Sequence, residues 1–481
     1  MRPLRFAIIG AGMAGILSAI KLAEAGFTDF TIYEKGDRFG GTWRENTYPG
    51  LSCDVPSQLY CYSFAPNPEW SHVFSPGQEI RTYFEVVARE FGIEKSTRFD
   101  DEVVSCEFSD GKWHLETHKG HRDEVDVVIA ATGVLHQPKF PDIDGIDTFE
   151  GACFHSARWD HSVNLGGARV GIIGTGSTAV QITSALVERV AHLSLFQRTA
   201  QWIMPQQNPE FTEEQKEQFR AHPEQLEQMH DSLSILFGGF AKAVIDAQSS
   251  EIQMIEDACR TNLEENVHDP VLRERLRPDY RAACKRLIIS PDFYDAIQQP
   301  NADLVTSGIE RMESGGVRTE DGVLHELDVL VLATGFKVDA FMRPMTVVGR
   351  DGLTLNEEWA ERPNAYLSIS IPDFPNFFML NGPNGPVGNF SLIDVAEQQF
   401  AYIMQLIDLL RSGENREVSA TRVAMDTFEA ERVEAARKTI WTTGCSSWYL
   451  DDRGVPAVWP FPFDRFRSEM ASPQLESYDV R

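Results

Sequence analysis

Residues 5–20 of the chain read RFAIIGAGMAGILSAI, and this stretch decides the fold of the first half. An apolar run leads into a glycine-rich turn, and the turn leads into a segment whose apolar residues recur at helical spacing. The glycines at Gly10, Gly12 and Gly15 allow a tight turn and let the backbone approach a phosphate group at the start of the helix. The pattern therefore predicts a strand, a phosphate-binding loop and a helix.

The same pattern returns at residues 169–186, RVGIIGTGSTAVQITSAL. The expected ligand-contacting residues of this second loop are Gly174, Gly176, Ser177 and Thr178. A charged residue stands at the same distance after each loop, but the sign of its charge differs: the first copy has Glu34 and the second has Arg198. An acid accepts hydrogen bonds from free ribose hydroxyls, whereas an arginine binds a ribose 2′-phosphate. We therefore expect two Rossmann-type domains, one for FAD and one for NADPH, in a protein that passes a hydride from nicotinamide to flavin.

Two matching segments mark the ends of the nucleotide-binding units, VDVVIAATG at 125–133 and LDVLVLATG at 327–335. Each combines a buried strand with a small-residue turn that a dinucleotide can approach closely. The turn residues expected at the cofactors are Thr132, Gly133, Thr334 and Gly335. We predict an α/β protein with an FAD-binding domain (1–145 and 342–481), an NADPH-binding domain (146–209 and 284–341) and an inserted helical subdomain (210–283).

The predicted insert contains an apolar patch that runs from Ile235 through Leu236 and Phe237 to Phe240. Two interpretations are open. The insert is a solvated cap whose helices bury the patch in their own core, or the patch faces a substrate cleft. Amphipathic helices normally bury such a face, so the first interpretation is favoured.

Length and charge limit the possible functions. A chain of 481 residues holds two or three domains. Its net charge of −28 disfavours nucleic acid and anionic membranes as partners. No apolar run reaches the ~18 residues that span a bilayer. The N-terminus is similar to a signal peptide, but the strand, loop and helix explain the same residues better.

The sequence contains seven scattered cysteines: Cys53, Cys61, Cys106, Cys153, Cys259, Cys284 and Cys445. Their spacing matches neither a zinc site nor a redox pair, so no metal is expected. We expect reduced thiols in a cytoplasmic protein.

Two longer motifs resemble one family of flavoenzymes. Residues 149–160, FEGACFHSARWD, match FxGxxxHxxxWD, the identifying stretch of the Baeyer–Villiger monooxygenases. Residues 40–54, GGTWRENTYPGLSCD, fit that family's GGxWxxxxYPGxxxD pattern. The resemblance runs over most of the chain and is weakest in the insert. It implies an FAD-containing enzyme that uses NADPH and O₂ to convert ketones into esters or lactones through a peroxyflavin.

The resemblance also implies a catalytic pair. The family carries a Lys-Arg pair after the insert, which here is Lys285 and Arg286. Arg286 would hold the negatively charged oxygen that this chemistry produces, and Asp54 would orient it. Lys285 would join Arg198 and Thr199 at the 2′-phosphate of NADPH.

Further roles follow from the same resemblance. The motif residues expected at the cofactors are Gly41, Thr42, Trp43, Tyr48 and Trp448. Trp448 is also expected at the substrate. His155 is a candidate general base, but the resemblance implies that it is a structural hinge residue. Trp159 would share this role. The substrate loop would supply Val387, Asn389, Phe390 and Leu392. This stretch, GPNGPVGNFSL, departs from the cyclohexanone-type enzymes and is similar to the GPN turn of heteroatom-oxidising flavin monooxygenases.

Two alternatives belong to other functional classes. A flavin-containing monooxygenase would oxidise amine nitrogen or sulfide sulfur, and it would need no arginine to hold an oxygen anion. A catalytically silent nucleotide-sensing protein would keep both pockets without the chemistry. Intact Asp54, Lys285 and Arg286 argue against the second alternative.

Overall fold

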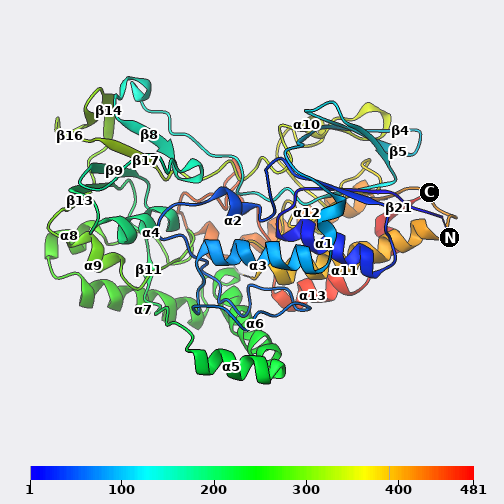
Figure 1. The fold of residues 1–481 in the computed structure, drawn as a ribbon, viewed down its shortest axis with the longest axis horizontal. Helices are drawn as coiled ribbons and strands as arrows, with labels where there is room; N and C mark the ends of the chain where they lie inside the picture. The colour runs from blue at the N-terminus through cyan, green and yellow to red at the C-terminus, as the bar shows by residue number, and fades with distance from the viewer. Residues whose placement is uncertain (1, 389) are drawn as a thin grey trace.

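The computed structural model describes residues 2–388 and 390–481, so the predicted substrate residue Asn389 lies outside the described residues. Its two main sheets lie in the two lobes that Figure 1 shows side by side, and the chain termini lie at the right edge of that view. The first sheet is parallel, with the order β19-β7-β1-β2-β3. Its strands are β1 (Phe6–Ile9), β2 (Phe30–Tyr33), β3 (Thr97–Arg98), β7 (Val127–Ala130) and β19 (Phe377–Met379).

The second sheet repeats this arrangement with the order β13-β10-β9-β17-β8, again with parallel pairing throughout. Its strands are β8 (Ala152–His155), β9 (Arg169–Ile173), β10 (His192–Phe196), β13 (Ala302–Val305) and β17 (Val329–Leu332). In each sheet the strand that precedes the glycine loop is central, and a helix follows the loop: α1 (Met13–Glu24) in the first, α4 (Ser177–Leu186) in the second. The predicted α/β fold with two Rossmann-type sheets is confirmed.

The two lobes also contain smaller sheets, which are not among the elements expected from the sequence. One has the order β18-β4-β5-β6, one joins β14, β15 and β16, and two are two-stranded pairs. Their strands are β4 (Val103–Ser109), β5 (Lys112–Thr117), β6 (Arg122–Val125), β11 (Ile203–Met204), β12 (Ile288–Ile289), β14 (Ile309–Glu313), β15 (Gly316–Thr319), β16 (Leu324–Glu326), β18 (Thr346–Val348), β20 (Val418–Ala420) and β21 (Tyr478–Val480). Because β18 pairs with β4 and β19 with β7, the topology supports our proposal that the chain after residue 341 returns to the first domain.

Helices from both ends of the chain enclose the largest apolar core. The contacts include α1 against α11 and α11 against α13. The helices outside the insert are α2 (Thr42–Glu45), α3 (Gly77–Glu90), α9 (Phe293–Ile297), α10 (Leu355–Glu358), α11 (Leu392–Arg411), α12 (Arg422–Ala436) and α13 (Phe463–Ala471). Among the helices of the described part of the chain, none is long and apolar enough to cross a membrane.

The stretch predicted as an insert contains α5 (Glu213–Ala221), α6 (Pro223–Ile245), α7 (Ser250–Asn266) and α8 (Pro270–Arg275). α5 projects at the bottom of Figure 1. The expectation that the apolar patch is buried in the insert's own core is wrong for Ile235 and Leu236, which are 74% and 66% exposed. The reason is that α6 buries a different set of residues, among them Ala241 and Val244.

The prediction of reduced cysteines is also wrong for one pair, because Cys284 and Cys445 form a disulfide. They stand 161 residues apart, so no local spacing signals the bond, and tertiary packing brings their Cα atoms to 6.2 Å. The other five cysteines are free, and of these Cys153 is exposed. The cytoplasmic location rested partly on reduced thiols and therefore stays a prediction.

Candidate active site

Both glycine loops present open helix ends. The N-cap residues Gly12 and Gly176 have extended backbones, and no described side chain caps either helix. The first backbone N–H groups of α1 and α4 therefore lack the partner that a serine or aspartate cap would supply. Helix ends of this kind bind phosphate groups through these N–H groups and the helix dipole.

Close backbone packing explains the first glycine of each loop. A Cβ at Gly10 would lie 2.5 Å from the carbonyl oxygen of Ala131, and one at Gly174 would lie 2.3 Å from that of Ala333. Both glycines also have a positive φ. Each loop is thereby held against the small-residue turn that carries Thr132 and Gly133 or Thr334 and Gly335.

One cavity of about 2460 Å³ joins the two loops, which is larger than the roughly 300–1,000 Å³ of a pocket for one drug-sized ligand. Its lining includes almost every residue predicted to bind a cofactor: Gly10, Gly12, Glu34, Gly41, Thr42, Trp43, Tyr48, Asp54, Thr132, Gly133, Gly174, Gly176, Ser177, Thr178, Arg198, Thr199, Lys285, Thr334, Gly335 and Trp448. Gly15 does not line it, because it packs against the loop itself, where a Cβ would lie 1.8 Å from the Gly10 carbonyl oxygen.

The fit to two dinucleotides can be tested at three glycines that line this cavity. A Cβ at Gly133, Gly176 or Gly335 would meet no described atom within 4 Å, so a side chain there would occupy open space beside the loops. The residues present therefore fit a dinucleotide at each loop.

Glu34 lies at the carboxyl end of β2 and is almost completely buried. One carboxylate oxygen accepts a hydrogen bond from the Ala11 N–H at 2.7 Å. The other accepts from the Gly36 N–H at 2.8 Å and from Arg44. The acid thus holds the first loop in place while lining the cavity, which leaves its remaining lone pairs for a ribose.

The cavity also has a basic corner. A side pocket of about 540 Å³ is lined by Arg198 and Lys285 and also by Arg275 and Arg277 from the end of the insert. Neither Arg198 nor Lys285 pairs with a carboxylate among residues 2–388 and 390–481, whereas Arg277 pairs with Glu264 and Glu274. Burial and the nearby charge of Arg198 lower the pKa of Lys285. Arg275 and Arg277 could not be predicted as site residues, because charges in a polar helical run look like a solvated face.

Arg286 lines the same cavity as the two loops and is paired with Asp54. Its Nε and Nη2 atoms donate to the same Asp54 oxygen, at 3.0 and 2.6 Å. The Asp54 charge, opposed by burial and helped by a contact with the Tyr449 hydroxyl, raises the pKa of Arg286 above its ordinary value. The arginine is therefore a fixed cation at any physiological pH.

Tyr449 is a further site residue that could not be predicted from the sequence. It is buried and its hydroxyl oxygen contacts the Arg286 guanidinium. A Cβ at Gly388 would lie 2.2 Å from this hydroxyl, so the close approach of the two segments requires glycine there. The same tail segment is tied to the residue before Lys285 by the Cys284–Cys445 disulfide. In the sequence, only the neighbouring Trp448 points to Tyr449 as a site residue.

The GGTWRENTYPG segment connects the two lobes. The Tyr48 hydroxyl donates to Gln181 of α4 at 3.0 Å, and the Trp43 indole N–H donates to Tyr60 at 3.1 Å. A Cβ at Gly50 would lie 2.5 Å from the Gln181 carbonyl oxygen, so the first lobe packs directly against α4 of the second.

His155 ends β8 and is buried. Its Nδ1 accepts from the Ala157 N–H at 3.1 Å, which leaves Nε2 to donate to the Gly335 carbonyl oxygen at 3.0 Å. Burial lowers the pKa of His155, so the ring is neutral. This geometry supports the structural role over that of a general base. Trp159 packs edge-on against Phe154 in the same lobe.

The predicted substrate loop borders the cavity at Val387, Phe390 and Leu392. Phe390 is buried and stacks on Phe463 with ring centres 4.4 Å apart, so it belongs partly to the core. Trp448 is 38% exposed and stacks on Tyr449. The apolar side of the cavity is therefore shared by this loop and the tail.

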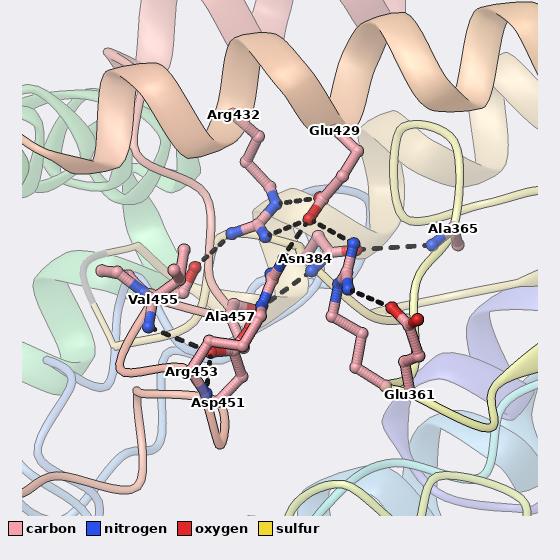
Figure 2. A network of polar contacts seen from close by, with 11 residues as sticks. Glu361, Ala365, Asn384, Glu429, Arg432, Asp451, Arg453, Val455 and Ala457 are labelled. Atoms are coloured by element: carbon pink, nitrogen blue, oxygen red, sulfur yellow. Dashed lines mark hydrogen bonds and ion pairs between the residues drawn. The ribbon is translucent and has the colours of Figure 1, made fainter.

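A network of polar contacts anchors the tail segment (Figure 2). At its centre Glu429 of α12 accepts hydrogen bonds from Arg432 at 2.7 Å and from Arg453 at 3.3 Å, and it forms an ion pair with Arg362 at 2.9 Å. Arg432 is completely buried and also donates to the Pro456 carbonyl oxygen. Arg453 in turn pairs with Asp451, which lines the cavity. The network fixes the segment that follows Trp448 and Tyr449.

Comparison with known proteins agrees with this fold and site. Residues 4–212 match the model of the "Flavin-binding monooxygenase-like" family. An uncharacterised monooxygenase of Mycobacterium tuberculosis is 47% identical over 475 residues, which cover 99% of this chain and 96% of the relative. A Baeyer–Villiger monooxygenase of Streptomyces coelicolor is 40% identical over 485 residues, which cover 99% of this chain and 92% of the relative.

Solved structures give the same result. Cyclohexanone monooxygenase from Rhodococcus sp. Phi1 bound to NADP⁺ superposes with a TM-score of 0.88 at 30% identity, and the match covers 99% of each chain. Fold and site thus define a flavin monooxygenase with two dinucleotide-binding sheets. With full-length relatives at this level of identity, the chain belongs to the Baeyer–Villiger monooxygenase family. The resemblance and the enzyme class predicted from the sequence are confirmed.

Proposed function

We propose that this enzyme inserts one oxygen atom of O₂ beside the carbonyl carbon of a ketone. Ketone, O₂, NADPH and a proton would give an ester or lactone, NADP⁺ and water. The observation that carries this proposal is the Arg286–Asp54 pair, which lines the same cavity as both dinucleotide loops. Family membership supports the same reaction.

Bound FAD would supply the redox chemistry, because a flavin accepts a hydride from NADPH and activates O₂. The first loop would hold it together with Glu34 and the turn at Thr132. The second loop would hold NADPH, with Arg198, Thr199 and Lys285 at the 2′-phosphate. The Thr199 carbonyl oxygen already accepts from Thr175 of this loop at 2.9 Å, so the strand end and the loop are joined.

Arg286 would act by electrostatics. When an oxygen nucleophile attacks a carbonyl carbon, negative charge develops on oxygen, and a cation that is already in place stabilises it without reorganisation. Asp54 holds the guanidinium through two hydrogen bonds, and the Tyr449 hydroxyl lies near it. Because the pKa of Arg286 is raised, this group would hold charge and would not transfer a proton. Amines and sulfides are themselves nucleophiles, so their oxidation would not depend on this cation.

Arg286→Ala and Arg286→Lys test the assignment. Ketone oxygenation should fall by about 10²–10³-fold in the alanine variant, the scale of losing one pre-positioned charge-stabilising group. Anaerobic bleaching of the flavin by NADPH should remain within a few-fold of the native rate, and sulfide oxidation should largely persist. The lysine variant should recover little, because it lacks the planar fork that binds Asp54.

Two results would count against the proposal. Ketone turnover that survives Arg286→Ala would show that another group stabilises the charge. A native enzyme that oxidises sulfides or amines but no ketone would replace the proposed reaction by heteroatom oxidation.

A further inference from the structure

Three large apolar side chains on helices α6 and α7 of the insert lie unusually exposed. Ile235 and Leu236 on α6 are exposed as given above, and Met254 on the adjacent helix α7 is 70% exposed. Large apolar residues of this kind are normally buried, and a cluster of exposed ones marks a binding surface.

Part of this cluster is continuous with the catalytic cavity. Leu236 and Met254 line the cavity, whereas Ile235 does not. The remaining apolar lining residues of the two helices are Leu233, Phe237, Phe240 and Ile255. Phe240 and Ile255 pack against the apolar cluster that contains Tyr449 and that Val387 also contacts. An apolar wall therefore extends from the neighbours of Arg286 to the exposed edge of the insert.

The charge on this wall is already neutralised. All residues of α6 and α7 are described, and Glu251 is the one charged residue that these helices contribute to the lining. It accepts from Lys242 at 2.7 Å. A polar chain would find few partners along the wall, whereas an apolar chain would gain from leaving water.

We propose that the substrate is a ketone with an apolar chain, held with its carbonyl group at Arg286 and its chain along Leu236 and Met254. This inference rests on the proposed function and adds the substrate class to it. The continuity of the wall with the cavity favours a small molecule over a second copy of the chain as the occupant.

A series of methyl ketones from 2-butanone to 2-dodecanone tests the inference with the FAD-loaded enzyme. Native kcat/KM should rise with chain length, by up to about fourfold for each fully buried methylene, and then level off. In Leu236→Ser the ratio of kcat/KM for 2-decanone to that for 2-butanone should fall by about fivefold or more, the scale of one or two lost methylene contacts.

Ile235→Ser is the matched control, since it makes the same change one residue away on the same helix and outside the cavity lining. It should leave the ratio unchanged. Both side chains are exposed, so neither substitution should affect folding, which thermal melting checks.

The inference is overturned if Leu236→Ser and Ile235→Ser give the same ratio as the native enzyme, or if native kcat/KM does not depend on chain length. Light scattering after size exclusion provides a further test. A dimer that dissociates in either variant would assign the patch to an interface between copies. If no ketone of any length is oxygenated while sulfides are, the proposed function itself fails, which is a different result from oxygenation without chain-length dependence.

Discussion

Arg286 and Asp54 stand 232 residues apart in the chain, and two nitrogens of the arginine donate to a single oxygen of the aspartate. The second carboxylate oxygen stays free of the arginine. The aspartate side chain is 23% exposed and comes from the segment that packs against α4. The pair thus links the motif of the first lobe to the residues after the insert.

Asp54→Asn should therefore weaken the placement of Arg286 without removing its charge. The amide oxygen still accepts a hydrogen bond, but the charge-assisted bond is lost, and hydrogen bonds to charged groups are worth about 1.5–3 kcal/mol. We expect kcat for ketone oxygenation to fall by about 10- to 100-fold. Reduction of the flavin by NADPH in the absence of oxygen is the control step, and its rate should change little. Equal losses in both steps would indicate a general structural defect.

Tyr449→Phe should have a smaller effect of the same kind. The Tyr449 hydroxyl is a polar neighbour that favours the charged form of Arg286. Its loss should cost about 0.5–1.5 kcal/mol, the scale of one neutral hydrogen bond, so kcat should fall by roughly 2- to 12-fold with KM for the ketone nearly constant. Tyr402→Phe is the matched control, because that buried hydroxyl bonds to Tyr478 at 2.9 Å and does not line the cavity. A variant Tyr449→Phe with native kcat and only a lowered Tm would assign the tyrosine to packing alone.

The residues that could be predicted from sequence are those in local motifs. Gly10 and Gly174 follow apolar strands, and the backbone of the turn at that point demands glycine, so both sheets could be anticipated. Tyr449 and the Cys284–Cys445 bond depend on the packing of segments about 160 residues apart, which no spacing encodes. The sequence pattern favours burial of Leu236 in the insert's own core, because amphipathic helices usually bury such residues, yet α6 packs through another face.

The basic corner makes a prediction about cofactor choice. Arg198→Ala should raise KM for NADPH by about 10-fold or more, because a bond between two charged groups is lost, while KM for NADH should change by less than about twofold. Arg275→Ala should shift the same ratio in the same direction by a smaller factor. Arg189 is exposed and lies outside the cavity lining, so Arg189→Ala controls for the change in net charge. Equal shifts for both nucleotides would remove Arg198 from the 2′-phosphate site.

The Glu429 network predicts a pH-dependent stability. Although burial opposes ionisation, the hydrogen bond and charge of Arg432, with Arg362 and Arg453, lower the pKa of Glu429 below its ordinary value of 4.5. The folded protein therefore binds this proton less tightly than the unfolded chain does. The network stabilises the fold fully above pH 4.5 and loses this contribution as the pH falls through the lowered pKa.

Glu429→Gln should accordingly lower the free energy of unfolding by about 3–5 kcal/mol at pH 7, because Arg432 is left as a buried charge without a carboxylate. The difference from the native protein should shrink as the pH is lowered towards 3, which urea unfolding at several pH values measures. Glu434→Gln is the control on the same helix, where the exposed pair with Arg437 is worth at most about 1 kcal/mol. A loss for Glu429→Gln that matches this control, or that is independent of pH, would show that the network does not anchor the tail through charge.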